Sequence, residues 1–201
     1  DIGVTGVQTC ALPISSGFSA RFTTLGTSGR HGPTTLGSYY NGQNHDGQVS
    51  LSSGIQLWRV PYTAKFRIEA VGATGGFDNN RNSRNYRSRG ARMIGTFSLT
   101  QGEVLKILVG QEGGINLVGS SSGGGGGSFV ARQDNTPLIV AGGGGGIESP
   151  RSRHSVCDAS TTTSGNAGYG GSQWPGGSSG GGAKTADNDN SGKELGFNFI
   201  L

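Results

Sequence analysis

Short segments in which apolar and polar residues alternate run through the first half of this chain. The clearest one begins at Phe66 and places Phe66, Ile68 and Ala70 on one face of an extended backbone. A period of two residues is typical of a β-strand with one buried face. We expect further strands at 49–51, 55–60, 93–99 and 104–109. Since no segment has the period of an amphipathic helix, the pattern predicts an all-β module, either a sandwich or a jelly roll.

Two more strand-like segments, 128–132 and 137–141, lie between two runs of five glycines. The runs are Gly123, Gly124, Gly125, Gly126 and Gly127, and Gly142, Gly143, Gly144, Gly145 and Gly146. Ordering glycine costs more backbone entropy than ordering any other residue, so low-complexity disorder or a flexible linker is one interpretation. The other is a bundle of extended helices of the polyproline type, with three residues per turn, in which only glycine fits where chains pack closely. Because each run adjoins a predicted strand, we predict that these ten glycines form a structural core.

The composition limits what kind of protein this can be. Glycine accounts for 41 of 201 residues, yet there is no collagen period and there are only six prolines. Hydrophobic residues make up 31% of the chain, so any apolar core must be local. The net charge of +4 is too small by itself to indicate nucleic-acid binding. No apolar run approaches the roughly 18 residues of a membrane span, and no signal-peptide pattern is present, although such absences say little about compartment in a chain that resembles a fragment.

The chain divides into three parts by composition. Residues 1–14 resemble a translated sequencing adapter, and Cys10 belongs to them, which leaves Cys157 as the other cysteine. We expect residues 15–118 to form the β-sandwich, and residues 119–201 to form a glycine-rich part truncated at its C-terminal end. The strands 128–132 and 137–141 would join the sandwich. Further glycine clusters at 168–171, 176–177 and 180–182 suit several polyglycine helices, and 195–201 alternates like another strand.

A cluster of arginines lies in the predicted loop before the strand at 93–99. It consists of Arg81, Arg84, Arg87, Arg89 and Arg92. Such a cluster could contact a polyanion such as heparin, or it could be a solvated loop, which is the interpretation we favour. Tyr86 is the single aromatic residue among them, which is too few for stacking nucleic-acid bases.

The motifs of catalysis and cofactor binding do not fit this sequence. The dinucleotide fingerprint needs a third glycine where Ile147 or Ser128 stands, and no helix is predicted to follow either run. Residues 179–185 end like a phosphate-binding loop, but Ala183 replaces its second glycine. His31, His45 and His154 have no metal-ligand spacing, and there is no nucleophile elbow. We therefore predict no catalytic residues, no cofactor and no metal, and we do not expect this fragment to be an enzyme.

Several stretches, taken in order, resemble the extracellular region of the anaplastic lymphoma kinase and leukocyte tyrosine kinase receptors. They are RFTTLGTSGRHGPT at 21–34, GIQLWRVP at 54–61, FRIEAVGATGG at 66–76, LKILVGQEG at 105–113, GGGGGSFV at 123–130 and PLIVAGGGGG at 137–146. The resemblance covers roughly residues 18–182. It implies a sandwich resembling tumour necrosis factor joined to packed polyglycine helices. It also implies a cytokine-like protein ligand, dimerisation on ligand binding, and a place at the cell surface.

The chain also departs from that family. Leu25 stands where these receptors tend to carry a cysteine, so a family disulfide is expected to be absent. No kinase motif is present, and whether the parent protein is a receptor tyrosine kinase stays open. The second interpretation is a secreted structural or adhesive glycine-rich protein without a kinase. Nucleic acid is not an expected partner, and a membrane is expected only through a transmembrane segment missing from this sequence.

Overall fold

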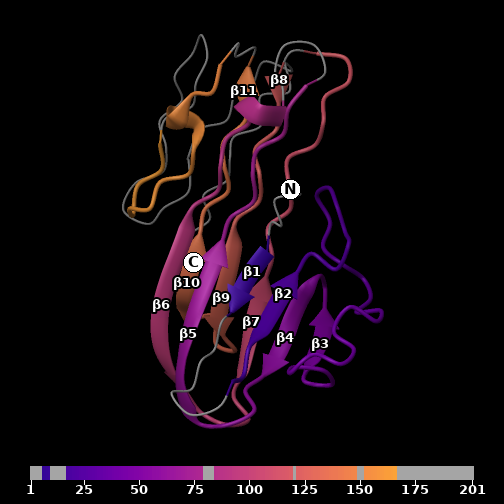
Figure 1. Ribbon diagram of the computed structural model, residues 1–201, viewed down its shortest axis with the longest axis vertical. Coiled ribbons are helices and arrows are strands. Elements are labelled where there is room, and N and C mark those ends of the chain that lie inside the picture. Colours follow the sequence, from indigo (N-terminus) through magenta and orange to yellow (C-terminus); the bar gives the residue numbers. More distant parts are fainter. Residues whose placement is uncertain (1–5, 10–16, 79–83, 120, 149–151, 167–201) are drawn as a thin grey trace.

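The computed structural model describes residues 6–9, 17–78, 84–119, 121–148 and 152–166. Within these ranges the regular elements are eleven strands and two short 3₁₀ helices (Figure 1). The strands are β1 (Gly6–Thr9), β2 (Ala20–Thr23), β3 (Val49–Ser52), β4 (Ile55–Arg59), β5 (Ala64–Val71), β6 (Arg92–Leu99), β7 (Val104–Leu108), β8 (Ser121–Ser122), β9 (Ser128–Arg132), β10 (Pro137–Ala141) and β11 (Ile147–Glu148); the helices are η1 (Arg84–Tyr86) and η2 (Ser155–Cys157). The predicted all-β class is confirmed, and the five strands expected from alternation correspond to β3 to β7.

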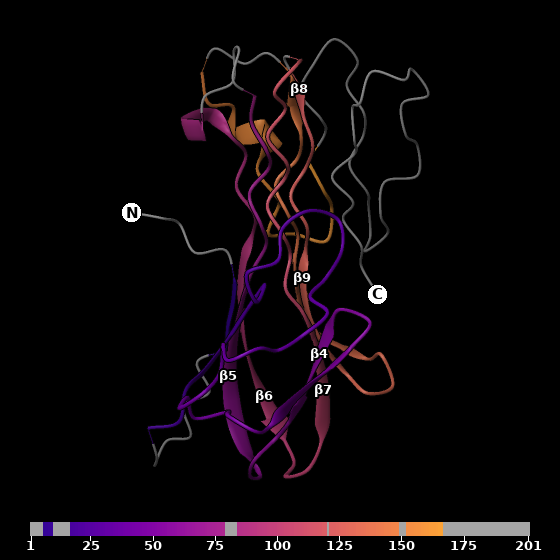
Figure 2. The same cartoon turned by 90° about the vertical axis from the view of Figure 1, so that its right-hand side faces the viewer.

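Two antiparallel sheets form one half of the molecule. One has the order β2-β1-β5-β6 and the other the order β10-β9-β7-β4-β3. The sheets occupy the lower half of Figures 1 and 2, while β8 and β11 pair with each other at the opposite end. The segment that resembles an adapter contributes β1, which pairs with β2 on one side and with β5 at Gln8 and Glu69 on the other.

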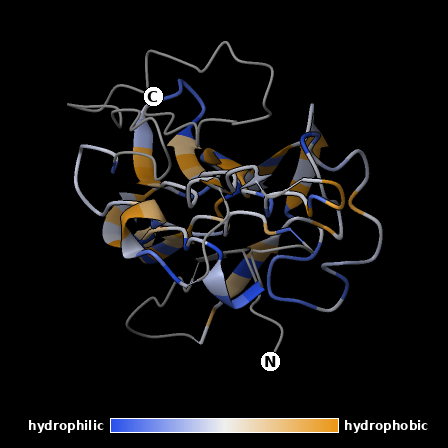
Figure 3. Cartoon of the chain, turned by 90° about the horizontal axis from the view of Figure 1, so that it is seen from above, coloured by the Kyte–Doolittle hydropathy of each residue, from blue (hydrophilic) through white to orange (hydrophobic). Residues whose placement is uncertain are grey.

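The apolar core lies between these sheets and is rich in aromatic side chains. Phe66 and Trp58 are buried and meet edge to face, with ring centroids 5.8 Å apart. The ring centroid of Phe22 lies 5.8 Å from that of Trp58, so Phe22 extends the same aromatic cluster. The prediction that Phe66, Ile68 and Ala70 face inward is confirmed, since all three are at most 1% exposed. Bands of alternating hydropathy along the strands reflect this division into an inner and an outer face (Figure 3).

Glu69 lies between these inward positions, and it is nevertheless buried. It accepts two hydrogen bonds from Arg92, from Nε at 2.6 Å and from Nη2 at 2.9 Å. Arg67 approaches the same carboxylate at 3.8 Å. The two cations explain how a carboxylate on the outer face of β5 can be only 8% exposed.

The core strands continue directly into extended glycine-rich segments that form the upper half of Figure 1. Residues 72–77 follow β5, residues 109–114 follow β7, and residues 142–146 follow β10. Residues 87–91 and 123–127 precede β6 and β9. In an antiparallel pair, one strand ends at the edge of the sheet where its partner begins. The segment that follows the first strand and the segment that precedes the second therefore lie at the same end, so the glycine-rich half contains segments from both sides of residue 118.

Candidate functional site

The glycine-rich half is organised around one central segment, residues 72–77. Gly72 donates a main-chain hydrogen bond of 2.9 Å to the carbonyl oxygen of Ala91. Three residues later, Gly75 donates one of 3.1 Å to the carbonyl oxygen of Ser88. One side of the central segment is thus bonded to the antiparallel segment that leads into β6.

The next pair of residues faces a different neighbour. The main-chain nitrogen of Ala73 donates a hydrogen bond of 2.9 Å to the carbonyl oxygen of Gly126, and that of Gly76 donates one of 2.9 Å to the carbonyl oxygen of Gly123. Both acceptors lie in the first glycine run. The spacing is again three residues, and the direction is again antiparallel.

A third neighbour completes the pattern. The carbonyl oxygen of Thr74 accepts a hydrogen bond of 3.0 Å from Gly113, and that of Phe77 accepts one of 2.9 Å from Asn116. Successive residues of the central segment are therefore hydrogen-bonded to three different segments of the chain in turn. In a β-strand they would alternate between two directions, so these contacts have a period of three instead of two.

The second glycine run joins the same network. Gly144 donates to the carbonyl oxygen of Ala73 at 2.9 Å, and Gly125 donates to that of Gly144 at 2.8 Å. Ala91 donates to Gly142 at 2.9 Å. Main-chain groups of separate segments are here paired with one another, and in each of these three pairs at least one partner is a glycine.

The close approach of these chains leaves no room for side chains at several of the predicted core glycines. A Cβ atom on Gly125 would lie closer than 3.0 Å to the carbonyl oxygens of Ala73 and Thr74, and one on Gly143 would lie closer than 3.0 Å to that of Gly125. Real Cβ atoms essentially never come so near. At Gly145 the nearest atom would be 3.3 Å away, so the positions are not equally restrictive.

The remaining predicted core glycines differ in what surrounds them. A Cβ on Gly144 would meet Ser88 Oγ at 2.5 Å, and one on Gly126 would meet the nitrogen of Gln111 at 3.0 Å. One on Gly127 would meet the ring of Phe129 at 2.9 Å. Gly123 and Gly142 contribute the acceptor oxygens described above, while Gly124 lies within the first run and Gly146 directly precedes β11.

Three buried serines bond to the glycine-rich segments, and sequence reasoning did not single them out. Ser128 Oγ donates to the carbonyl oxygen of Val71 at 2.7 Å and accepts from the nitrogen of Gly110 at 3.0 Å. Ser122 Oγ donates to Gly76 at 3.0 Å, and Ser88 Oγ donates to Gly145. For Ser122 and Ser128 the available signal was their place next to a glycine run, because a small hydroxyl residue can supply a hydrogen bond without separating the packed segments.

The structure assigns different environments to the predicted arginine cluster. Arg81 lies outside the described residues. Arg92 is bound to Glu69, and this hydrogen bond raises the pKa of the Arg92 guanidinium. Arg87 pairs with Glu112 at 3.4 Å. Arg84, in η1, is exposed, so the cluster does not present its charges as one group.

The main chain of Arg89 is hydrogen-bonded to residues that follow η2. Its nitrogen donates to Asp158 Oδ1 at 2.8 Å, and its carbonyl oxygen accepts from Ala159 at 2.8 Å. Asp158 also pairs with Arg153. The segment after η2 therefore packs along the arginine loop, and it brings the buried Cys157 with it. Cys157 forms no disulfide within the described part of the chain.

The histidines lie apart from one another. His45 is fully buried, and its ring centroid lies 4.4 Å from that of Tyr40 and 4.9 Å from that of Phe22. Burial lowers the pKa of the His45 imidazole, while the backbone of Arg21 and the charge of Asp46 act in the opposite direction. His31 is exposed. The described residues hold no group of three His, Cys, Asp or Glu side chains that could bind a metal ion.

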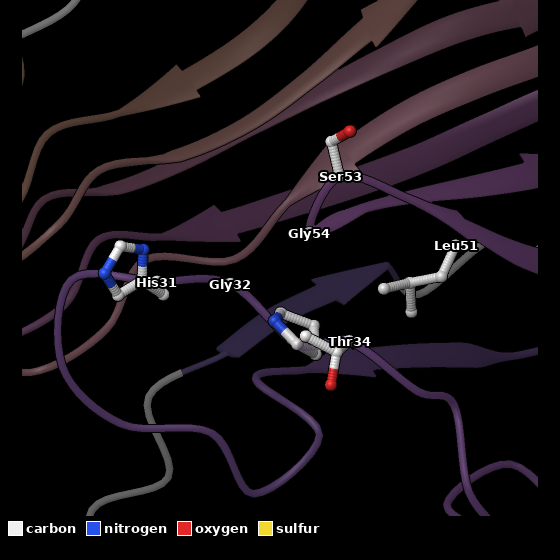
Figure 4. Close-up of a pocket in the computed structure, with 7 residues that line it drawn as sticks. His31, Gly32, Thr34, Leu51, Ser53 and Gly54 are labelled. Atoms are coloured by element: carbon white, nitrogen blue, oxygen red, sulfur yellow. The ribbon is translucent and has the colours of Figure 1, made fainter.

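One open pocket, of about 370 Å³, lies beside His31. Figure 4 shows it where the loop that carries His31 and Thr34 passes the β3–β4 turn at Ser53 and Gly54. Leu51 supplies an apolar wall. No charged pair converges on this pocket, so its geometry indicates no particular chemistry.

Comparison with known proteins finds a partial similarity to a receptor. The chain is 40% identical over 99 residues to the leukocyte tyrosine kinase receptor of Mus musculus. The match covers 46% of this chain and 11% of the length of that receptor. No family model matches the chain. Among the described residues, no helix is both long and apolar enough to cross a bilayer. The chain is thus related in part to a receptor tyrosine kinase, of which it spans a small fraction.

Proposed function

We propose that this chain is the extracellular, glycine-rich, ligand-binding module of a receptor similar to the leukocyte tyrosine kinase receptor. The observation that carries the proposal is the 40% identity over 99 residues to that receptor. Such a level of identity over a glycine-rich region means that residues other than glycine are shared as well. The module would act at the cell surface and perform no chemistry of its own.

The glycine-rich half would serve as a rigid scaffold of polyglycine-type helices. Its support is the period of three in the hydrogen bonds of residues 72–77 with three neighbouring segments. Extended helices with three residues per turn have no internal hydrogen bonds, so their main-chain groups are free to bond between chains. In this proposal the two sheets form a sandwich of the jelly-roll type found in tumour necrosis factor.

A protein ligand of the cytokine kind would bind the sandwich and its loops, and receptor dimerisation would follow. Rigidity favours this role, because a preorganised surface loses little conformational entropy on binding. For a polyanion such as heparin, Arg84 and Arg89 are the most available arginines among those described, since both are exposed, whereas Arg87 and Arg92 are already paired with carboxylates.

The complete transcript provides the most direct test. We expect its reading frame, downstream of this segment, to encode a membrane-spanning helix and then a tyrosine kinase domain. A stop codon soon after the glycine-rich region, or repeated copies of the same module, would contradict the receptor proposal. Either result would favour a secreted adhesive protein.

A chimeric receptor tests ligand binding separately. The matching 99-residue region of the mouse receptor is replaced by the corresponding region of this chain, and surface display and ligand-dependent phosphorylation are measured. We expect the chimera to reach the surface and to respond to ligand. Normal display without any response would show that this chain shares the scaffold and not the ligand site.

A further inference from the structure

The loop of residues 37–47 reaches the apolar core through two ring-bearing side chains. Of these residues, all of which the structure describes, Tyr40 and His45 are buried and the others are exposed. The ring centroids of Tyr40 and His45 lie 4.4 Å apart. Both rings also meet Phe22 of β2, with centroid distances of 5.8 Å for Tyr40 and 4.9 Å for His45. One cluster of rings therefore attaches an otherwise exposed loop to the core.

The main chain of this loop is bonded largely to itself. Four main-chain hydrogen bonds of 3.0–3.2 Å join residues three apart within 38–48. A bond to another part of the chain runs from Asn44 Nδ2 to the carbonyl oxygen of Gly17, and at 3.4 Å it is long and exposed. Gly37 and Gly47, at the two ends, have positive φ angles of 53° and 71°. A segment with internal hydrogen bonds and a glycine at each end can move as one unit about those ends.

The two buried rings differ in how they are held. Tyr40 Oη donates a hydrogen bond to Gln56 Oε1 and accepts one of 3.2 Å from the nitrogen of Thr23. Neither ring nitrogen of His45 has a hydrogen-bond partner among the described residues. His45 is therefore retained in the core by burial and by its contacts with the neighbouring rings. A positive charge on this imidazole would lack both water and a bonded acceptor, which is costly in a buried place.

The groups around His45 do not offset that cost. Burial lowers the pKa of the imidazole and is the largest effect, while the main chain of Arg21 in β2 and the carboxylate of Asp46 in the loop act against it. Tyr40 is neutral, because burial raises the pKa of its hydroxyl above the ordinary value of 10.0. Arg59, the charged residue of β4, is exposed. The side chains that β2 and β4 contribute to the cluster are uncharged: Phe22, Gln56 and Trp58.

We propose that residues 37–47 form an acid-sensitive loop, which protonation of His45 releases from the core while the two sheets stay folded. In the released loop the imidazole is hydrated and takes up a proton at its ordinary pKa of 6.5, whereas its pKa in the attached loop is lower. Acid therefore favours release, and neutral solution favours attachment. Release would uncover Phe22 and Tyr40 and so create an apolar surface that is present only in acid. The inference concerns this loop alone and does not rest on the receptor proposal.

Hydrogen–deuterium exchange of the complete chain, measured by mass spectrometry at about pH 7.5 and about pH 5.5, tests the proposal. Each exchange rate is divided by the intrinsic rate of an unfolded peptide at the same pH. On this normalised scale we expect residues 37–47 to exchange about tenfold faster at the lower pH, because one unit below 6.5 protonation shifts the equilibrium by about that factor. Residues of β5 and β6 should keep their normalised rates. Loop exchange that does not change with pH would overturn the proposal, and so would a loss of protection that β5 and β6 share with the loop.

Variants identify the group that titrates. In His45→Leu the normalised exchange of the loop should be equal at the two pH values, and in the control His31→Leu it should match that of the unaltered chain. Tyr40→Phe removes the hydroxyl bonds to Gln56 and Thr23, so it should speed loop exchange at both pH values and leave their ratio unchanged. A pH-dependent loop in His45→Leu would assign the effect to another group and overturn the role of His45.

A measurement on the unaltered chain supplements the variants. The protonation of His45, followed by nuclear magnetic resonance of its imidazole, should have the same pH midpoint as the opening of the loop. Both midpoints should lie below 6.5, because the attached loop resists protonation. If His45 became protonated while the loop stayed attached, the two midpoints would differ and the proposal would be wrong.

Discussion

The nitrogen of Gly144 lies 2.9 Å from the carbonyl oxygen of Ala73, so the second glycine run is bonded directly to the segment that extends β5. That carbonyl oxygen also lies under the position that a Cβ on Gly125 would occupy. One peptide group therefore meets both glycine runs. The two runs share a neighbour that is distant from each of them in the sequence.

Valine at Gly125 or Gly144 should destabilise the protein. In either case the new side chain would meet neighbouring atoms at less than 3.0 Å, and the chains would have to separate. Overpacking of this kind typically costs about 1–3 kcal/mol, and we expect the upper end because the obstructing atoms are largely main chain. Thermal or urea unfolding measures the change. An unaltered melting temperature in both variants would show that the runs are linkers.

A matched pair of neighbouring glycines gives a sharper version of the same experiment. A Cβ on Gly113 would lie closer than 3.0 Å to the nitrogen of Gly76, whereas one on Gly114 would have no atom within 4 Å. We expect Gly113→Ala to lower the free energy of unfolding by about 2 kcal/mol and Gly114→Ala to change it by less than about 0.5 kcal/mol. Similar effects of the two substitutions would count against close chain packing.

Ser128→Ala should lower the free energy of unfolding by about 2 kcal/mol. The substitution would leave the carbonyl oxygen of Val71 and the nitrogen of Gly110 without the hydroxyl that now bonds to both, and buried unpaired groups are costly. Chemical denaturation provides the measurement. The control is Ser50→Ala on the exposed face of β3, which we expect to be nearly neutral.

Removal of the Glu69 carboxylate should have a modest effect. Glu69→Gln weakens two hydrogen bonds from Arg92, but the Arg92 side chain is 61% exposed and solvent screens the pair. We expect only a small loss of stability, because exposed ion pairs contribute little. A double-mutant cycle with Arg92→Gln isolates the pairwise coupling. A coupling energy near zero would mean that Glu69 is held by other neighbours.

The protein should lose stability in mildly acidic solution because of His45. Burial lowers the pKa of this imidazole below its ordinary value of 6.5, so the unfolded chain takes up a proton more readily than the folded one. The contribution of neutral His45 is complete above pH 6.5. It decreases as the pH falls through that value toward the lower pKa of the folded state. Melting temperatures recorded from pH 8 to pH 5 should show the decline.

A variant without a titrating side chain identifies the source of this decline. His45→Leu should flatten the profile between pH 8 and pH 5, and His31→Leu, at an exposed position, should leave it unchanged. Since neither ring nitrogen of His45 has a hydrogen-bond partner among the described residues, the leucine variant should be no less stable at neutral pH. An acid decline that persists in His45→Leu would assign the effect to the carboxylates.

The sequence by itself indicated β3 to β7, β9 and β10, seven of the eleven strands in the described residues, and the positions of the glycine runs; it did not indicate β1, β2, β8 or β11. Alternation is a local property, so residues such as Phe66, Ile68 and Ala70 indicate both the strand and its buried face without knowledge of the partners. The glycine runs are visible in composition alone. The sequence also showed the arginine cluster, although it could not show which of its members were neutralised.

Only the tertiary structure decided which segments of the chain pack against one another. Residues 72–77 contain neither glycine run, yet they form the centre of the glycine-rich half, because β5 carries them between the segments that flank β6, β7 and β9. The partners of Arg87 and Arg92, and the bonds of Ser128 and Asn116, depend in the same way on strand order. Hydrogen bonds between distant segments leave no periodic signature in the chain. Sequence periodicity therefore predicts which segments are extended, and the packing of those segments determines what each glycine touches.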